Sequence, residues 1–395
     1  PGDQRQHRFR LHLGFEPPFV PRLMPHPQGA VATHIVTEHA DDTTLETQRA
    51  ANFGSDRIAR AEGAIGGFVK HGIPVTKSIF YVNPNDVPCL GQKKEPQFSL
   101  KEKPEHLDFL ERLVSQGHEI CLHTAQPDNH DREAVAEALA FVTQRFGSEA
   151  WIDHAPTFVR PSLSADGGNS SSPSYSRDLL EDAGIRFIWH VGCEDRGCLP
   201  GGPGLDLLWS SGGDHLPMPL WWRAQDTGDL VSWPAQHLNY DLWMSLHTDE
   251  SLAELVASWG VHIAHAYPSR ICAENKMIMR GEDGLWTIEP EFDKTLARIA
   301  ALSAEGDLNL STVSAFFSRC LAIELVDVSF RPNGETVLLN NGHETIQDLT
   351  VAVRAPSISV LGAKHEFRRV GEDVLAWFDL RPQDPVKITR YKALS

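Results

Sequence analysis

The sequence predicts an α/β protein with a mostly parallel sheet, open or closed, followed by a small β-sandwich. In the first ~320 residues, short apolar runs alternate with amphipathic stretches, and strand–helix–strand order repeated this often favours a parallel sheet. In the last ~75 residues, closely spaced strand-like runs are separated by turn-like breaks, and no helical period is found. The two parts are therefore expected to fold as separate domains.

The strands expected in the first part are short apolar runs bounded by polar, Gly or Pro residues. They are Thr33–Thr37, Val75–Val82, Glu119–His123, Ala150–His154, Arg186–His190, Leu230–Pro234 and Val261–His265. Helical patterns with one apolar face lie between them. They span His106–Gln116, Glu133–Phe146, Ser176–Ala183, Glu250–Trp259 and Phe292–Ala304. Gly184 and Gly260 follow two of these helices, as C-terminal caps do.

The last part contains short runs with strand character and turn signals such as Asn341-Gly342 between them. The expected strands are Thr336–Asn340, Leu349–Val353, Ile358–Leu361, Glu366–Val370, Val374–Leu380 and Val386–Tyr391. We place the boundary near Ile323–Val328, which gives domains of residues 1–322 and 323–395.

Composition is that of a globular protein and argues against several functions. The 395 residues include 53 acidic and 36 basic side chains, for a net charge of −17, and 41% are hydrophobic. A chain this acidic repels phosphate backbones, so no nucleic-acid partner is expected. No apolar run approaches the ~18 residues that a membrane span needs. The oligomeric state is left open.

The N-terminal sequence does not predict a cellular location. Pro1–Arg5 is polar and no apolar core of a signal peptide follows it. The chain does not begin with Met, which indicates processing or trimming, so a cytoplasmic protein and a secreted, processed one both fit. Six cysteines are too few for a disulfide scaffold.

Histidines and carboxylates gather at the ends of the expected strands. The segments are Thr37–Asp42, Gly117–Thr124, Trp151–His154 and Gly260–His265. Because the C-terminal ends of parallel barrel strands converge on one face, these side chains are expected to meet there. Imidazole and carboxylate are the usual ligands of zinc and similar ions in hydrolases. The pattern therefore indicates a divalent metal site, with zinc expected first, and water activated by that metal.

Three of these segments, together with a fourth one that lies between the first two in the sequence, resemble a known family. His71–Phe80 is similar to the second strand of the polysaccharide deacetylases of the NodB-homology superfamily, and Gly117–Thr124 is similar to their "GHEIgnHT" motif. Val261–His265 resembles the last-strand motif, and Thr37–Asp42 takes the place of the "TFDDG" motif. The resemblance covers roughly residues 30–315 and identifies the chain as a divergent branch. It implies a distorted (β/α) barrel, commonly of seven strands, that uses one Asp and two His to bind a metal and removes acetyl groups from glycans.

The sequence departs from the family pattern at three places. Pro127 stands where the second metal-binding His is expected, so Asp128, His130 or a residue of another strand must replace it. The paired Asp of the first motif aligns either with Asp41-Asp42 or with Glu38-His39. The Arg-containing motif is either Arg160-Pro161 or is replaced by Asp153-His154.

Strand alternation selects among these candidates. If the first strand stays extended, His39 and Asp41 share a face and Glu38 points away. We therefore expect a metal held by a subset of His39, Asp41, His123 and His154. Asp41 or Glu38 is the expected base, and His265 the expected acid. His262 alternates away from His265 and is given no role.

The aromatic residues in the middle of the chain are candidates for contacts with the carbohydrate partner that the resemblance implies. Trp189 and Trp222 belong to a group that either packs in the core or stacks on sugar rings. Arg160 is a candidate for orienting substrate, although a surface salt bridge is the favoured explanation.

The leading hypothesis is a metal-dependent carbohydrate deacetylase that cleaves N- or O-acetyl groups. One alternative keeps the barrel and the metal but hydrolyses another amide or a glycosidic bond. The other is an inactive carbohydrate-binding protein with the sandwich as binding module. Pro127, which stands where a metal-binding His is expected, favours this alternative.

Overall fold

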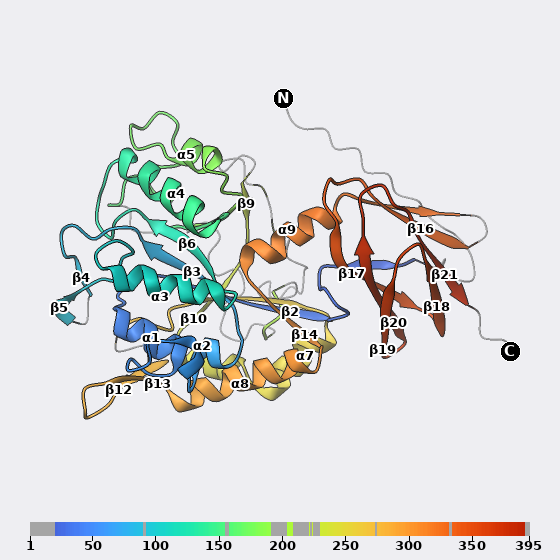
Figure 1. The fold of residues 1–395 in the computed structure, drawn as a ribbon, viewed down its shortest axis with the longest axis horizontal. Helices are drawn as coiled ribbons and strands as arrows, with labels where there is room; N and C mark the ends of the chain where they lie inside the picture. Colours follow the sequence, from blue (N-terminus) through green and yellow to red (C-terminus); the bar gives the residue numbers. More distant parts are fainter. Residues whose placement is uncertain are drawn as a thin grey trace. The chain divides into compact units, whose positions relative to one another are not determined.

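The computed structural model describes residues 20–89, 92–154, 158–190, 204–207, 221, 223, 230–272, 275–331 and 334–391. It divides into two compact units. One is the α/β unit, Ala30–Ser318, and the other combines the segment up to Gly29 with the segment from Arg319 onward. Both can be followed in Figure 1.

The α/β unit is built around a curled parallel sheet, which has nine strands over the described residues. In sheet order they are β10 (Gln236–Leu238), β11 (Val261–Ala266), β2 (Ala32–Glu38), β3 (Val75–Phe80), β6 (Glu119–Thr124), β7 (Ala150–Ile152), β8 (Phe187–Trp189) and β9 (Val231–Ser232), with β14 (Leu308–Ser311) paired to β2. The edge strands β9 and β10 are joined by residues 233–235 alone. The sheet therefore curls until its two edges are linked by the chain, and the predicted distorted (β/α) barrel is confirmed.

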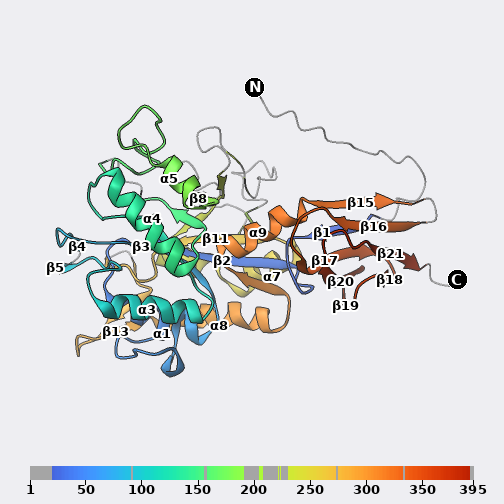
Figure 2. The ribbon, with the colours of Figure 1, turned by 45° about the horizontal axis from the view of Figure 1, so that its top comes forward.

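Helices cover the outer face of this sheet (Figures 1 and 2). They are α1 (Leu45–Phe53), α2 (Gly67–Lys70), α3 (Pro104–Ser115), α4 (Arg132–Phe146), α5 (Arg177–Asp182), α6 (Tyr240–Leu246), α7 (Asp249–Ala257) and α8 (Pro290–Ala304). Local signals start them: Thr44 forms a capping box with Thr47, and the Asp131 side chain caps α4 by accepting from Ala134 N–H. Short elements complete the unit: η1 (Ala61–Gly63), the ribbon β4 (Pro88–Cys89) with β5 (Gln92–Pro96), and β12 (Ile278–Arg280) with β13 (Trp286–Ile288).

Strand alternation gives the sheet two different faces. On β2, Val36 points outward into a core that contains Phe292 of α8. His39, just past the strand, points the other way and stacks on His265 of β11, with ring centroids 3.8 Å apart. Inside the curl, Phe317 of α9 (Val313–Ile323) packs near Phe187 and Trp233. The interior is thus filled by side chains, and the histidines at the strand ends face one another across it.

The second unit is an antiparallel β-sandwich. One sheet has the order β1 (Arg22–Met24), β17 (Ile346–Arg354), β20 (Asp373–Leu380), β19 (His365–Val370), and the other β15 (Val326–Phe330), β16 (Glu335–Asn340), β21 (Val386–Tyr391), β18 (Ser357–Leu361). Its core holds buried side chains such as Leu349, Phe378 and Ile388. All six strands expected from the sequence are present, and the predicted sandwich is confirmed.

The domain division differs from the expected one at the N-terminus. β1 pairs with β17, so residues 20–29 belong to the sandwich and not to the barrel. This pairing was not expected from the sequence, because a strand of three residues shows too little periodicity to be recognised. Elements β10, β14, α1, α6 and α9 were likewise not expected from periodicity.

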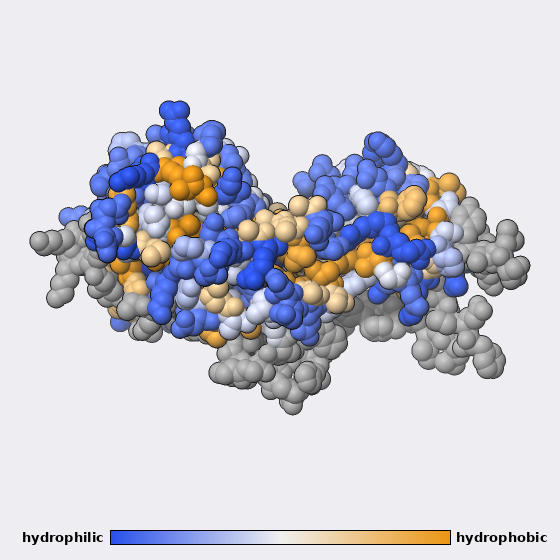
Figure 3. All heavy atoms as spheres, turned by 90° about the horizontal axis from the view of Figure 1, so that it is seen from below, coloured by the Kyte–Doolittle hydropathy of each residue, from blue (hydrophilic) through white to orange (hydrophobic). Residues whose placement is uncertain are grey.

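The surface carries both hydrophilic and apolar residues. On the face drawn in Figure 3, hydrophilic residues predominate and apolar groups are interspersed among them. Within the described ranges, no helix has both the length and the apolar character needed to cross a membrane.

Candidate metal centre

Four neighbouring parts of the sheet bring the site residues together. His39 and Asp41 follow β2, His123 lies in β6, His154 follows β7 and His265 lies in β11. These strands occupy one continuous stretch of the sheet, from β11 through β2, β3 and β6 to β7, and all run parallel. Their C-terminal ends therefore meet at one end of the curl.

Three side chains meet there at contact distance. The two oxygens of Asp41 lie 3.3 Å from His123 Nε2 and 3.2 Å from His154 Nδ1, and these two nitrogens are 3.0 Å apart. The other nitrogen of His123, Nδ1, lies 2.7 Å from the carbonyl oxygen of Ile152. Because a carbonyl oxygen can only accept, Nδ1 carries the proton and Nε2 presents its lone pair to the cluster.

His39 adds a fourth candidate donor. It is 2% exposed, and its Nε2 has no hydrogen-bond partner among the described residues. One of its ring nitrogens lies within 4.8 Å of the donor atoms of Asp41 and His123. Burial first, and then the neighbouring His265 and His123, lower the pKa of His39, so its neutral ring is favoured. A neutral, unpaired imidazole nitrogen is what a metal ligand requires.

The histidines around Asp41 favour the ionised form of its carboxyl group. Burial by itself would raise the pKa of this carboxyl, but the interactions with His123 and His154 outweigh it and hold the pKa well below its usual range. With 23% of its side chain exposed, Asp41 is also the member of the cluster that solvent reaches.

These residues fit a divalent transition metal. Donor atoms held about 2.1 Å from one ion are about 3.0 to 3.4 Å apart, and the three measured separations fall in this interval. Two imidazoles and one carboxylate are also a common donor set for zinc and iron. The hydrogen bond from His123 to Ile152 fixes the orientation of that ring, as the outer contacts of metal ligands do.

His265 stands beside this cluster in an aromatic surrounding. Its Nε2 lies 3.1 Å from the Tyr267 hydroxyl, and Trp189 packs edge-on at 4.4 Å between ring centroids. His237 of β10 stacks at 5.0 Å. Burial, and next the proximity of His237, lower the pKa of His265 well below its usual value. Trp189 thus lies at the site, in contact with His39 as well.

Glu38 lies on the opposite face of β2 and cannot serve as the base. It is fully buried, where it forms an ion pair with Lys77 and accepts a hydrogen bond from Gln48 of α1. The alternative assignment of the base to Glu38 is therefore wrong, for the reason that strand alternation gives. Lys77 loses much of its basicity to burial, so its pKa is lowered although Glu38 opposes this.

The remaining expected site residues do not join the cluster. Arg160 is exposed and pairs with Asp166 at 2.8 Å, so it makes a surface salt bridge. Asp128 accepts a hydrogen bond from Asn85, and His130 Nδ1 bonds the carbonyl of Asp128, so neither replaces the ligand missing at Pro127. His154 is the candidate for the ligand that Pro127 cannot provide. Trp222 lies outside the described residues.

Asp42, which one alignment of the paired Asp included, is buried and pairs with Arg270 at 3.0 Å. Three residues near the site were missed by sequence reasoning: Tyr267, His237 and Arg270, the last of which lies over the Tyr267 ring. Tyr267 could have been found from its place two residues beyond His265. His237 lies in the three-residue strand β10 and Arg270 in a loop, where no periodic pattern marks them.

Comparison with known proteins gives no family. No family model matches the chain, and no curated protein matches it. Solved structures similar to it include pullulanase type I from Bacillus subtilis str. 168 complexed with maltose, at 10% identity and a TM-score of 0.35, covering 96% of this chain and 72% of that one. AmyP in complex with maltose has 8% identity and a TM-score of 0.36, over 91% and 97% of the two chains. The α-amylase from Geobacillus thermoleovorans complexed with acarbose has 10% identity and a TM-score of 0.33, covering 91% of this chain and 98% of that one. Likeness at this level assigns no function.

Proposed function

We propose that the chain is a metal-dependent hydrolase that removes acetyl groups from a carbohydrate. The observation that carries the proposal is the close approach of three side chains at the strand ends: His123 Nε2 and His154 Nδ1 lie 3.0 Å apart, and they lie 3.3 and 3.2 Å from the two oxygens of Asp41. The resemblance of Gly117–Thr124 to the deacetylase motif supports the choice of an acetyl group.

Asp41, His123 and His154 would hold the ion, with His39 in reach as a further ligand. Bound there, a divalent ion makes water more acidic and polarises a carbonyl group. Asp41 is the carboxylate of the cluster, and an oxygen of it that does not bind the ion would accept the proton of the attacking water.

A proton donor for the leaving group stands across the cluster. His265 Nε2 and the Tyr267 hydroxyl are 3.1 Å apart and can share a proton next to the reacting centre. The ring of His39 stacks on His265 and packs edge-on against His123, so it connects this pair to the cluster.

Substrate contacts are expected from Trp189 and Arg270. The indole of Trp189 borders both His39 and His265, where an apolar wall suits the methyl group of an acetyl. Arg270, paired with Asp42, also lines an open cavity with Tyr240, Asn275, Lys276 and Trp286. A polar and aromatic lining of this kind suits the hydroxyl groups and ring faces of a sugar.

The experiment compares acetate release from N-acetylated and O-acetylated oligosaccharides by the full chain, with and without added Zn²⁺. The informative variant is His123→Asn. Its amide nitrogen can keep the hydrogen bond to Ile152 while the Nε2 donor is lost. We expect acetate release to be lost in this variant, and lost in the wild type after chelation.

The matched control is His106→Asn, because His106 is also buried and also bonds a backbone carbonyl through Nδ1, that of Ser99, without being a member of the cluster. It should keep full activity. Acetate release by chelated His123→Asn would overturn the proposal. Release of reducing sugar ends in place of acetate would replace it with the alternative, hydrolysis of a glycosidic bond.

A further inference from the structure

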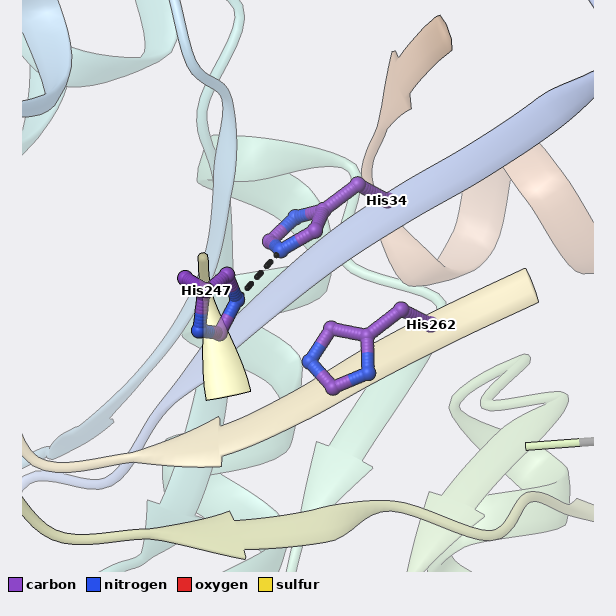
Figure 4. Close-up of side chains that lie close together, drawn as sticks. All are labelled: His34, His247 and His262. Carbon is purple, nitrogen blue, oxygen red and sulfur yellow. Dashed lines mark hydrogen bonds between the residues drawn. The ribbon is translucent and has the colours of Figure 1, made fainter. Parts of the chain in front are cut away.

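A second group of histidines lies on the other face of the same strands. His34 of β2 and His262 of β11 are register partners and point outward, toward the helix layer. His247 follows α6 and completes the group. Figure 4 shows the three rings turned toward a common point, each coming from a different element. All three side chains are buried, at 1%, 0% and 0% exposure.

Backbone contacts fix how two of these rings are protonated. His247 Nδ1 lies 3.0 Å from the carbonyl oxygen of Trp243, and His262 Nδ1 lies 2.8 Å from that of Leu205. Carbonyl oxygens only accept, so both Nδ1 atoms carry the proton. The Nε2 atoms of His247 and His262 therefore present lone pairs to the middle of the group.

The three neutral rings do not offer enough N–H groups to donate a hydrogen bond to each of these lone pairs. His34 Nε2 lies 3.0 Å from His247 Nε2 and can give one proton to it. His262 Nε2 then stays without a partner, and it has none among the described residues. A buried acceptor with no partner is destabilising, because it has lost its hydrogen bonds to water without replacement.

The spacing suits a cation in place of the missing proton. One donor atom from each ring lies within 4.8 Å of the others. The separation of 3.0 Å between two of them is close to the about 3.3 Å expected for two nitrogens on one tetrahedral zinc ion. Contacts from the second ring nitrogen to backbone carbonyls are the usual support of metal-binding histidines.

We infer that His34, His247 and His262 form a second, structural metal site for an ion that imidazole binds, such as Zn²⁺ or Cu⁺. The role is structural because the site is closed: Trp243 stacks on His247 with centroids 4.0 Å apart, and no member reaches solvent. The ion would enter as the chain folds and would tie β2, β11 and the end of α6 together. This site is separate from the proposed catalytic centre and does not depend on it.

The test measures metal content of the purified full chain after loading with Zn²⁺ or Cu⁺ and removal of the free ion. His262→Asn keeps the hydrogen bond to Leu205 and removes the Nε2 donor, and His123→Asn does the same at the first centre. We expect each variant to lose about one ion per chain, the double variant to lose both, and His106→Asn to lose none. The thermal midpoint of His123→Asn should still rise when the ion is added.

The outcomes separate the two sites. If His123→Asn binds no metal, or if His262→Asn binds as much as the wild type, the second site is refuted. If the wild type holds one ion that His262→Asn loses and His123→Asn keeps, the second site stands and the first centre fails. Should His262→Asn not fold, the metal content of His123→Asn decides: about one ion, placed on the three rings by anomalous diffraction, supports the inference, and none overturns it.

Discussion

At the scale of single residues, the molecule places histidines and charges in sharply different surroundings on the two faces of one strand. His39, just past β2, points into the interior beside Asp41. Glu38 and His34 of β2 point to the outer face, under the helices. Alternation alone separates them, since successive side chains of a strand point to opposite faces. Residues adjacent in the sequence therefore lie in different places: some at the proposed metal centre, and others in the packed layer between the sheet and the helices.

The buried pair Lys77–Glu38 gives a prediction about stability. Replacing Lys77 by Met leaves Glu38 without its cation in a fully buried position, and we expect the free energy of unfolding to fall by about 3–5 kcal/mol. Chemical denaturation measures it. The exposed pair Arg145–Glu111 is the control, where Arg145→Met should cost less than about 1 kcal/mol. Equal losses at the two pairs would show that burial does not set the cost.

How far the sequence predicted the site depends on which signal each residue carries. Asp41, His123 and His154 could be proposed together because each follows an apolar strand-like run, and the parallel fold brings such ends together. His247 has no such signal, because it ends a helix that periodicity did not reveal. The group of His34, His247 and His262 was missed for this reason, and His262 was set aside on correct grounds, since it does point away from His265.

At the scale of elements, the segment after β7 carries His154, the proposed replacement for the ligand missing at Pro127. Asp153 precedes His154 and accepts hydrogen bonds from Ser162 Oγ at 2.7 Å and from the backbone and hydroxyl of Ser164 at 3.0 and 2.8 Å. It also accepts from Trp151 Nε1 at 3.2 Å. One carboxylate thus ties the strand end to the returning loop, and it fixes the backbone that carries His154.

Asp153→Ala should therefore loosen this loop and weaken the first metal centre. We expect faster amide hydrogen exchange over residues 158–166 and about 10–100-fold weaker metal binding, as for other outer contacts of metal ligands. Isothermal titration and exchange mass spectrometry measure both. Asp166→Ala is the control in the same loop, because its Arg160 salt bridge is exposed. Unchanged affinity in Asp153→Ala would mean that His154 is positioned by other contacts.

Element by element, the sequence predicted long and strongly periodic segments well. Helices such as α4 and α8 and strands such as β6 and β11 lie close to the expected ranges, because caps and apolar faces mark them. Elements of two to four residues, such as β10 and β14, were missed because they are too short to show a period. Tertiary pairing with β11 and β2 forms them.

At the scale of the whole molecule, the buried histidines make stability depend on pH. Burial, and next Lys77, lower the pKa of His118 to about 3, from an ordinary value of 6.5. Above pH 6.5 neither state binds a proton there. Between pH 6.5 and about 3 the unfolded chain binds a proton that the folded chain excludes, so stability falls as the pH falls.

The expected loss from His118 is about 1.4 kcal/mol for each pH unit within that window. His118→Gln should therefore reduce the loss of stability between pH 7 and pH 5 by about 2 kcal/mol. Urea denaturation at the two pH values measures this. The exposed His365, changed to Gln, should leave the pH dependence as it is. The same dependence in wild type and His118→Gln would count against a proton-free His118 in the native state.

The pairing of β1 with β17 has a consequence for biosynthesis. Arg22 lies opposite Ala352, so the sandwich pairs a strand that is synthesised before the α/β unit with a strand that is synthesised after it. At about 5–20 residues per second, β1 waits roughly 15 to 65 s for its partner to leave the ribosome. All of Ala30–Ser318 is synthesised within this interval. The α/β unit can thus fold on a nascent chain while the sandwich still lacks its later strands, and the sandwich is completed only after the α/β unit has been synthesised.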